Sequence, residues 1–208
     1  MSSNPAIPDT AVSRLATYLR VLTESQRDGR QYVSSASIGE RAGVSPDQVR
    51  KDLSHFGEFG RPGVGYDADQ LRRHLARILR LDRVQMAVLV GAGSLGSALA
   101  RYSGFEPRGF RIAAVFDVDP ERVGTKLGEV AVEHVDRLPE RVRALGASIG
   151  IIAVPRLACQ RVAEAMAAAG LKAILNFAPA KVEVPESVNV RSVDLARELE
   201  RLAYHLPG

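Results

Sequence analysis

The sequence predicts an α/β protein with an N-terminal winged helix-turn-helix domain at residues 1–80 and a C-terminal Rossmann-like dinucleotide-binding domain at residues 81–208. Three observations lead to this fold class. Residues 1–80 place apolar residues at helical spacing and then become rich in glycine. After residue 83, short apolar runs alternate with helical segments, which is typical of an open parallel sheet. Residues 91–96 read GAGSLG, the pattern of a phosphate-binding turn.

The first region begins with two expected helices. Apolar residues share one face of the first helix: Val12, Leu15, Ala16, Leu19 and Leu22. We expect Asp9 to cap this helix and Gly29 to end it. A second, short helix is expected over Ala36–Ala42, before a turn at Gly43.

A third helix follows and is the candidate recognition helix of the DNA-binding domain. The segment SPDQ at 45–48 is a strong start signal, so we expect a helix over about Pro46–Phe56. Val49 and Leu53 lie four residues apart and should face the core. The opposite face then presents polar and basic side chains suited to the major groove of DNA. A solvated, charged helix face is the competing interpretation.

A glycine-rich hairpin or loop over 57–65 follows the third helix and resembles a wing. Arg61 lies at its expected tip, where it could enter a minor groove. One more helix runs to about Arg80, with an apolar stripe formed by Leu71, Leu75, Ile78 and Leu79. The helix cap, the helix-turn and the wing together favour DNA binding over a merely charged surface. The domain boundary is expected at Arg80–Arg83.

The second region is predicted as a parallel sheet with crossover helices. Buried strands are expected at Val84–Val90, Arg111–Asp117, Ile149–Val154 and Ala173–Phe177. Helices are expected from the glycine turn to about Ser103, over Leu157–Ala169, and over about Val193–Leu206. The last helix carries one apolar face, made of Leu195, Leu199, Leu202 and Leu206.

The glycine turn predicts a dinucleotide site because it joins a buried strand to a helix. Gly91 permits the tight turn, Gly93 lets the backbone approach a pyrophosphate, and Gly96 lets helix and strand pack closely. Asp117 ends the second strand about 20 residues later, where an acid accepts the ribose hydroxyls. A carboxylate there repels a 2′-phosphate, so NAD(H) is expected rather than NADP(H). A purely structural turn, or a site for CoA or a flavin nucleotide, remains the alternative.

An NAD-dependent oxidoreductase is the rival function. It would need a proton-transferring group at the nicotinamide end. His134 and His205 have no obvious partner in the sequence, and the dinucleotide fold uses nearly all the residues after the boundary, which leaves no substrate domain. We therefore expect no catalytic residue and no enzyme.

Composition limits the other possibilities. The 208 residues are 46% hydrophobic and 25% charged, as in a globular protein with a buried core. The net charge of +4 is concentrated in residues 1–80, with 12 Lys and Arg against 9 Asp and Glu, a weak indication of an anionic partner. Cys159 is the only cysteine, which excludes an intrachain disulfide and a CxxC metal site. Without a span-length apolar run or a signal segment, the sequence predicts a cytoplasmic protein with no membrane partner and no metal.

Several motifs in this order resemble the Rex family of redox-sensing transcriptional repressors over essentially the full chain. They are SRL (13–15), QVRKDLS (48–54), GVGY (63–66), VGAGSLG (90–96), FDVDP (116–120) and LNFAP (175–179). The resemblance implies a homodimer that binds a palindromic double-stranded operator and releases it when NADH binds. It also implies that the last helix crosses to the other subunit.

The resemblance, together with the motifs, assigns the candidate site residues. Cofactor contacts to NADH or NAD+ are expected from Gly91, Ala92, Gly93, Ser94, Leu95, Gly96, Tyr102, Asp117, Val154, Pro155, Phe177, Ala178, Pro179 and Asp194. DNA contacts are expected from Arg14, Ser45, Gln48, Arg50, Lys51, Ser54 and Arg61. Leu195 departs from the family pattern, since members of the family often carry an aromatic residue at this position.

A switching mechanism follows from the charge of the cofactor. NAD+ carries a positive nicotinamide ring that is costly to bury, so an apolar pocket floored by Val154, Pro155 and Phe177 should favour NADH. NADH must also bind one arrangement of the two subunits better than the other. Arg20 and Asp194 are a candidate charge link between the two regions, on the basis of their opposite charge alone.

Overall fold

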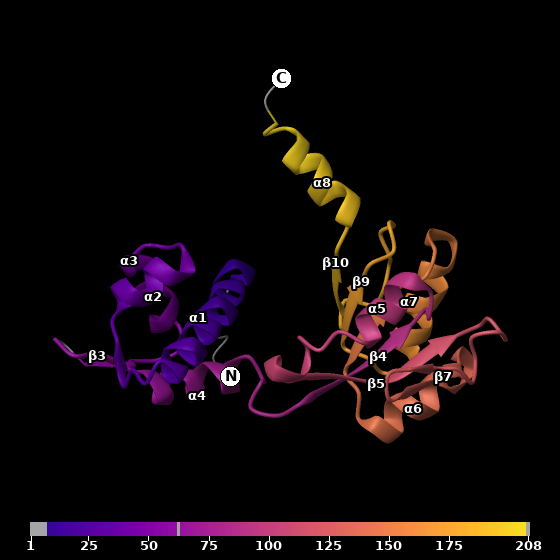
Figure 1. Cartoon of the computed structure of the whole chain (residues 1–208), viewed down its shortest axis with the longest axis horizontal. Helices are drawn as coiled ribbons and strands as arrows, with labels where there is room; N and C mark the ends of the chain where they lie inside the picture. Colours follow the sequence, from indigo (N-terminus) through magenta and orange to yellow (C-terminus); the bar gives the residue numbers. More distant parts are fainter. Residues whose placement is uncertain (1–7, 62, 207–208) are drawn as a thin grey trace. The chain divides into compact units, whose positions relative to one another are not determined.

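The computed structural model describes residues 8–61 and 63–206, with the Asp9 side chain also outside the description. The chain divides into two compact units, Met1–Arg83 and Val84–Gly208 (Figure 1). Each unit has its own hydrophobic core.

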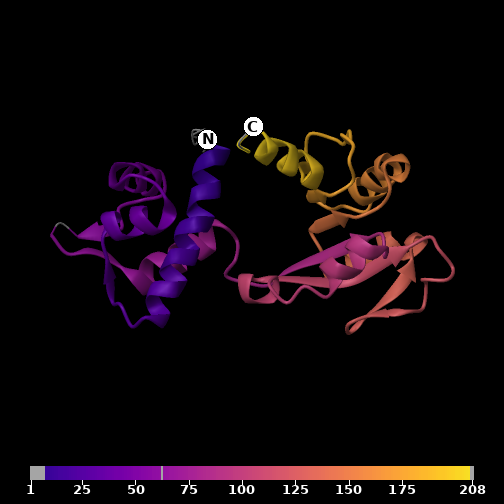
Figure 2. The ribbon, with the colours of Figure 1, turned by 45° about the horizontal axis from the view of Figure 1, so that its top comes forward.

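The first unit is a helical domain with a small antiparallel sheet. Its helices are α1 (Asp9–Arg27), α2 (Ser35–Ala42), α3 (Pro46–Ser54) and α4 (Ala68–Ile78). Its strands, in the order β1-β3-β2, are β1 (Tyr32–Val33), β2 (Gly60–Arg61) and β3 (Gly65–Asp67). The long helix α1 packs against α4 and α2 (Figures 1 and 2). The glycine-rich segment is therefore a hairpin, as one of the two predicted forms, and the sequence did not predict the short strand β1 that pairs with it.

The buried face of α1 differs from the predicted stripe. Leu15 and Leu22 are fully buried as expected, but Val12 is 40% exposed and Tyr18 is fully buried. The predicted stripe contained only aliphatic residues, but the helix also buries Tyr18, whose hydroxyl donates a hydrogen bond to Asp52. The predicted cap is also wrong, since Asp9 is the first helical residue and Pro8 occupies the cap position.

Helix α3 begins as predicted and ends two residues earlier. The Ser45 hydroxyl accepts a hydrogen bond from the backbone N–H of Gln48 at 3.1 Å, which caps the helix just before its first residue, Pro46. Val49 and Leu53 are buried, so the predicted inward face is confirmed. The turn before α3 places Gly43 at φ +70°, a left-handed conformation that suits glycine.

A buried carboxylate joins α1 to α3. Asp52 is 1% exposed and accepts hydrogen bonds from Arg14 (Nε at 2.6 Å, Nη2 at 2.8 Å), the Tyr18 hydroxyl (2.8 Å) and the side-chain amide of Gln48 (2.7 Å). Burial raises the pKa of Asp52, but these donors outweigh it and hold the pKa below its ordinary value. The pKa of Tyr18 is raised, chiefly by burial and then by its bond to Asp52. The orientation of the third helix is thus fixed by ionic hydrogen bonds as well as by apolar packing.

The second unit is a seven-stranded sheet in the order β10-β9-β8-β4-β5-β7-β6, parallel except for the edge strand β6. The strands are β4 (Gln85–Val90), β5 (Phe110–Asp117), β6 (Lys126–Leu127), β7 (Val130–His134), β8 (Ile149–Ile152), β9 (Ala173–Asn176) and β10 (Asn189–Ser192). The helices are α5 (Ser94–Ala100), α6 (Leu138–Leu145), α7 (Cys159–Ala168) and α8 (Leu195–Ala203). The four predicted strands are confirmed, while β6, β7, β10 and α6 were not predicted.

The two faces of this sheet are covered by different helices. Val90, Phe116 and Ile152 pack in one core with residues of α6 and α7. Leu89 and Val115, on the opposite face, pack in a second core with residues of α5. Burial on both faces explains why the central strands are continuous apolar runs in the sequence.

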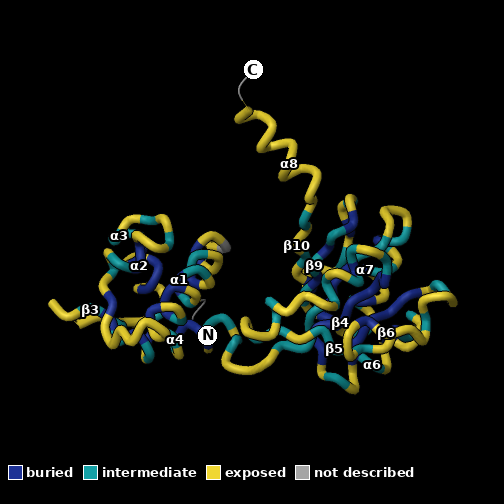
Figure 3. The backbone as a smooth tube through the Cα atoms, viewed as in Figure 1, coloured by how far each residue is buried: buried dark blue, intermediate teal, exposed yellow. Residues whose placement is uncertain are grey.

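Helix α8 stands away from the sheet of its own unit and is exposed along its whole length (Figures 1 and 3). It begins after Asp194, whose carboxylate accepts a hydrogen bond from the Arg197 amide at 3.1 Å. The predicted apolar stripe is present but uncovered, with leucines that are 57% to 70% exposed: Leu195, Leu199, Leu202 and Leu206.

The Asp52 network generates a stability prediction. Asp52→Asn leaves the Arg14 guanidinium without its anion, so we expect a loss of about 3 kcal/mol in the free energy of unfolding at pH 7. Asp47→Asn, on the same helix but 87% exposed in the side chain, is the matched control and should cost less than about 1 kcal/mol. Urea denaturation followed by circular dichroism measures both variants.

The same comparison has a defined pH dependence. A carboxyl with a lowered folded-state pKa stabilises the fold above its unfolded pKa, and this contribution is lost as the pH falls through the folded pKa. The difference between wild type and Asp52→Asn should therefore shrink as the pH falls from about 5 toward about 2. Equal free energies of unfolding for wild type and Asp52→Asn at pH 7 would contradict the stabilising role of the Asp52 carboxylate.

Candidate functional site

The strand order of the second unit reverses at β4, which has β5 on one side and β8 on the other. With β4 as the first strand of the fold, the parallel strands follow the order typical of doubly wound dinucleotide-binding proteins. A ligand crevice is expected outside the carboxyl ends of the strands at such a reversal. A cavity of about 940 Å³ lies at this place.

The cavity brings together half of the residues predicted to bind the cofactor. Those that line it are Gly91, Gly93, Leu95, Asp117, Val154, Pro155 and Phe177. The remaining predicted residues are not among its lining: Ala92, Ser94, Gly96, Tyr102, Ala178, Pro179 and Asp194. The lining also includes residues of α6 and α7 and their leading loops, among them Leu138 and Val162, which the sequence did not indicate.

The three glycines of the turn have different physical roles. Gly91 lies at φ +106°, and a Cβ there would be 2.4 Å from the Ala153 carbonyl oxygen. A Cβ on Gly96 would be 1.7 Å from the Gly91 carbonyl oxygen. Both glycines are therefore required by the fold itself. A Cβ on Gly93 would meet only the Arg122 Nη1 atom, at 3.6 Å, so packing within the chain does not require a glycine at this position.

Asp117 ends β5 as a buried carboxylate at the cavity. It is 7% exposed, and its oxygens accept hydrogen bonds from the Ala92, Val118 and Asp119 amides at 2.7, 2.8 and 3.0 Å. Arg122 donates to the same carboxylate at 3.2 Å. Burial raises the pKa of Asp117, but these donors outweigh it and keep the pKa below its ordinary value, so the group is an anion at neutral pH.

Arg122 is a charged cavity residue that sequence reasoning missed. Its Nη1 atom is bonded to Asp117, and its Nε atom lies 3.3 Å from the Asp119 carboxylate. It follows the FDVDP motif directly, and the signal that could have found it is the i, i+3 spacing from Asp119 on the loop after β5. A basic group beside the acid that is predicted to accept the ribose hydroxyls bears on the choice between NAD(H) and NADP(H).

The loop after β9 is shaped by a second residue that the sequence analysis did not assign. Asn176 is fully buried, accepts a hydrogen bond from the Ala178 amide at 2.9 Å and donates to the Ala180 carbonyl at 2.8 Å. These bonds hold the turn that carries Phe177 into the cavity lining. Asn176 thus positions the apolar part of the cavity without lining it.

Five of the predicted cofactor residues are exposed: Ser94, Tyr102, Pro155, Pro179 and Asp194. Tyr102 is 52% exposed, and its ring contacts Phe105 edge-on at 5.0 Å. Asp194 caps the exposed helix α8. Arg20 is an exposed residue of α1, in the other unit, so its link to Asp194 stays a prediction.

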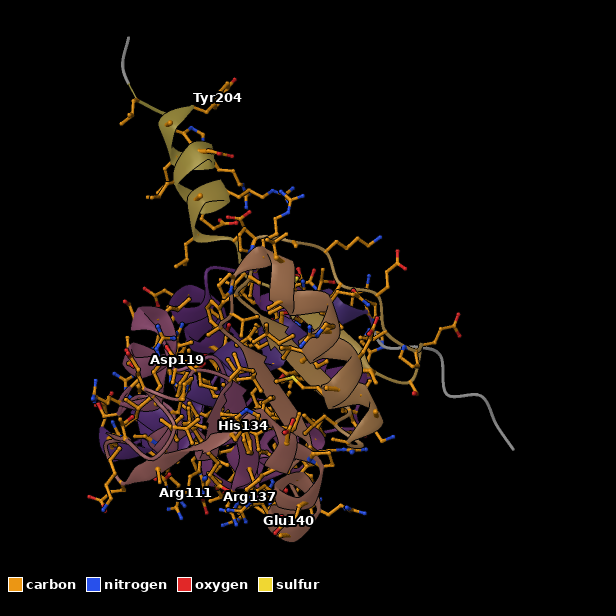
Figure 4. All side chains as sticks on the ribbon, turned by 90° about the vertical axis from the view of Figure 1, so that its right-hand side faces the viewer. Arg111, Asp119, His134, Arg137, Glu140 and Tyr204 are labelled. Atoms are coloured by element: carbon orange, nitrogen blue, oxygen red, sulfur yellow. The ribbon has the colours of Figure 1, made fainter. Side chains whose placement is uncertain are left out.

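The histidines weighed for proton transfer lie elsewhere. His134, labelled in Figure 4, ends β7. Its Nδ1 atom lies 3.1 Å from an Asp136 carboxylate oxygen, and it is not among the residues that line the cavity. His205 lies beside Tyr204 beyond the end of α8. Within residues 8–61 and 63–206, no cluster of His, Cys, Asp and Glu could hold a metal ion. No helix in that part of the chain is long and apolar enough to cross a membrane.

Four of the residues predicted to bind DNA are exposed on α3 and the hairpin of the first unit. Arg50, Lys51 and Ser54 are exposed on α3, and Arg61 is exposed on β2 of the hairpin. Arg50 donates to the Ser35 hydroxyl at 2.8 Å and pairs with Asp47.

Three other predicted DNA residues have roles inside the first unit. Ser45 caps α3, while Arg14 and Gln48 donate to the buried Asp52. Gln48 is half-buried, and its side-chain amide donates one hydrogen bond to Asp52. Contacts of these residues with DNA stay predictions.

Family models match both parts of the chain. A model described as a CoA binding domain matches residues 83–180, and one described as a putative DNA-binding protein N-terminus matches residues 6–54. Among solved structures, RSP in complex with β-NAD+ and operator DNA is similar with a TM-score of 0.90 and 35% identity, covering 96% of this chain and 92% of that one. RSP in complex with β-NADH is similar with a TM-score of 0.84 and 33% identity, covering 96% and 94%.

Curated relatives match nearly the full chain. The redox-sensing transcriptional repressor Rex of Desulfitobacterium hafniense is 48% identical over 200 residues, which covers 96% of this chain and 95% of the relative. Rex of Thermus thermophilus is 48% identical over 198 residues, covering 95% and 93%. The early resemblance is therefore confirmed, and the chain belongs to the Rex family of redox-sensing transcriptional repressors.

Proposed function

We propose that this chain is a DNA-binding transcriptional repressor that senses the NADH/NAD+ ratio and releases its operator when NADH binds. The observation that carries the proposal is that Gly93 and Asp117 both line the cavity where the strand order reverses. Gly93 leaves room for a pyrophosphate, and Asp117 supplies a buried anion for the ribose. Its relatives are named as redox-sensing repressors, and the RSP structures contain NAD+ with operator DNA, or NADH.

The apolar part of the cavity supports a preference for NADH. Val154, Pro155 and Phe177 contribute apolar surface at the ends of β8 and β9. The positive nicotinamide ring of NAD+ would lose water there without gaining a counter-ion, whereas the neutral ring of NADH would not. The free energy of binding should therefore favour NADH.

The same cavity argues against catalysis. Its described lining contains no His, Lys or Tyr, the usual groups that move a proton during hydride transfer. The relatives are named as repressors. We therefore propose a binding site that does not turn the cofactor over.

A CoA ligand is the second candidate, since the matching family model is described as a CoA binding domain. CoA carries a phosphate on its adenosine ribose, and the Asp117 carboxylate by itself would repel it. NAD(H), whose adenosine ribose has free hydroxyls, fits the anion better.

The exposed helix α8 supports a homodimer. Its leucine stripe is uncovered in one copy, and apolar faces of this kind are usually buried. On the sheet face that carries α5, Leu175 and Phe177 of the β9 region are only half-buried. We propose that α8 of each subunit covers apolar surface of the other, and that the two recognition helices then meet the two halves of a palindromic operator.

Operator release is the first test of this function. We select a palindromic DNA from a random pool with the protein, then titrate the complex with NADH and with NAD+ in a gel-shift assay. NADH should release the DNA at lower concentration than NAD+. Lys51→Ala should weaken operator binding by about 1–3 kcal/mol without changing NADH affinity. Release by neither nucleotide would reject the sensor function.

Two glycine variants separate cofactor binding from folding. Gly93→Ala should leave the free energy of unfolding within about 0.5 kcal/mol of wild type, because the methyl group meets only the end of the Arg122 side chain, at an ordinary contact distance of 3.6 Å. It should nevertheless weaken NADH binding by about tenfold or more, since the methyl would occupy pyrophosphate space. Gly96→Ala should instead cost about 3 kcal/mol or more of stability, through collision with backbone. Unchanged NADH affinity in Gly93→Ala, measured by fluorescence titration, would count against the site.

The role of α8 is tested by oligomeric state. The wild type should have the mass of two chains in size-exclusion chromatography with light scattering, and Leu199→Asp should have the mass of one, because a buried, unpaired carboxylate is costly. Arg197→Asp places the same group on the opposite face of the helix and should remain dimeric. A single-chain mass for the wild type would reject the dimer.

A further inference from the structure

The Asp117 carboxylate is fully occupied before any cofactor arrives. One oxygen accepts from the Val118 and Asp119 amides, and the other accepts from the Ala92 amide and from Arg122 Nη1. A carboxylate offers about four lone-pair positions in total. The ribose hydroxyls of a dinucleotide therefore find no free acceptor on Asp117 unless one of the present donors leaves.

Arg122 is the donor that can leave. The other three are backbone amides, fixed by the turns after β4 and β5. Arg122 is a long side chain, 46% exposed, and its bond to Asp117 is the longest of the four at 3.2 Å. Because the Arg122 side chain is partly exposed, water can solvate the guanidinium once it leaves Asp117, so breaking this bond costs less than moving the backbone.

A released Arg122 would remain at the mouth of the cavity. Its Nε atom lies 3.3 Å from an Asp119 carboxylate oxygen, which tethers the guanidinium. It also lies on the Gly93 side of the crevice, with Nη1 3.6 Å from the position of a Cβ on that glycine. The other charged residues of the lining are Asp136 and Arg161, and both come from elsewhere in the unit.

We propose that Arg122 is a specificity-determining residue that occupies the ribose acceptor of the empty site and, once displaced, provides a cation for a 2′-phosphate. The inference rests on the proposed NAD(H) function of the same cavity. An acid alone excludes NADP(H) by repulsion, but an arginine beside the ribose accommodates the additional phosphate, because the guanidinium donates charge-assisted hydrogen bonds to phosphate oxygens. The pocket thus discriminates against NADPH less strongly than Asp117 by itself would.

The test measures the ratio of the dissociation constants for NADPH and NADH, by fluorescence titration of the full-length protein. In Arg122→Gln this ratio should rise by about tenfold or more over wild type, the lower end of the effect of a charge-assisted hydrogen bond. Arg122→Lys keeps the positive charge and should stay closer to wild type. Arg108→Gln removes an exposed arginine away from the cavity lining and should leave the ratio unchanged.

The outcomes separate this inference from the proposed function. If NADH binds to every variant and the ratio in Arg122→Gln equals that of wild type, the role of Arg122 is wrong while the NADH site stands. If the wild type binds neither nucleotide, both the site and the inference are overturned. Circular dichroism of each variant verifies the fold. If Arg122→Gln does not fold, Arg122→Lys is the remaining test. A ratio of NADPH to NADH dissociation constants in Arg122→Lys that differs from wild type by tenfold or more would contradict the claim that a positive charge alone is required at this position.

Discussion

The close approach of two backbone segments is the constraint on which the cofactor crevice depends. Helix α5 comes so near the end of β4 that no side chain fits at Gly96, and the turn between them requires the left-handed conformation of Gly91. This approach brings the Ala92 amide to the Asp117 carboxylate and leaves only the end of the Arg122 side chain within contact distance of a Cβ on Gly93. The relative positions of Gly93, the predicted pyrophosphate site, and Asp117, the predicted ribose site, thus depend on this backbone contact.

Sequence reasoning recovered the parts of the molecule whose cause is local. The capping serine of α3, the glycine turn and the central strands each follow from spacing and residue type, and the structure contains them. It missed β6 and β10 because these edge strands are short and partly exposed, and it missed β7 because the mixed burial of that strand leaves only a short apolar run. It assigned Gln48 to DNA because polar residues on a helix face suggest contact with a ligand, and it assigned Arg14 through the family resemblance; both contacts stay predictions. Only the fold brings Asp52 to them. Arg122 was missed for the same reason, since its proximity to Asp117 depends on the turn after β5.

Two buried carboxylates organise the two units in comparable ways. Asp52 and Asp117 each accept four or more hydrogen bonds, and in each case the donors outweigh burial, so that both remain anionic. Their donors differ in mobility. Asp52 is held by side chains within a closed core, which favours a rigid recognition helix, whereas Asp117 exchanges one side-chain donor at an open cavity. The first carboxylate serves architecture, and the second is available for recognition.

The uncovered leucines of α8 link the activity of this protein to its abundance. If the fold of each subunit is completed by another copy, mass action determines how much competent protein exists, and dilution favours an incomplete form. A newly synthesised chain would expose this stripe to proteases and to aggregation until it meets its counterpart. The cell would then hold the regulator above a threshold amount, below which operator occupancy falls more steeply than protein level.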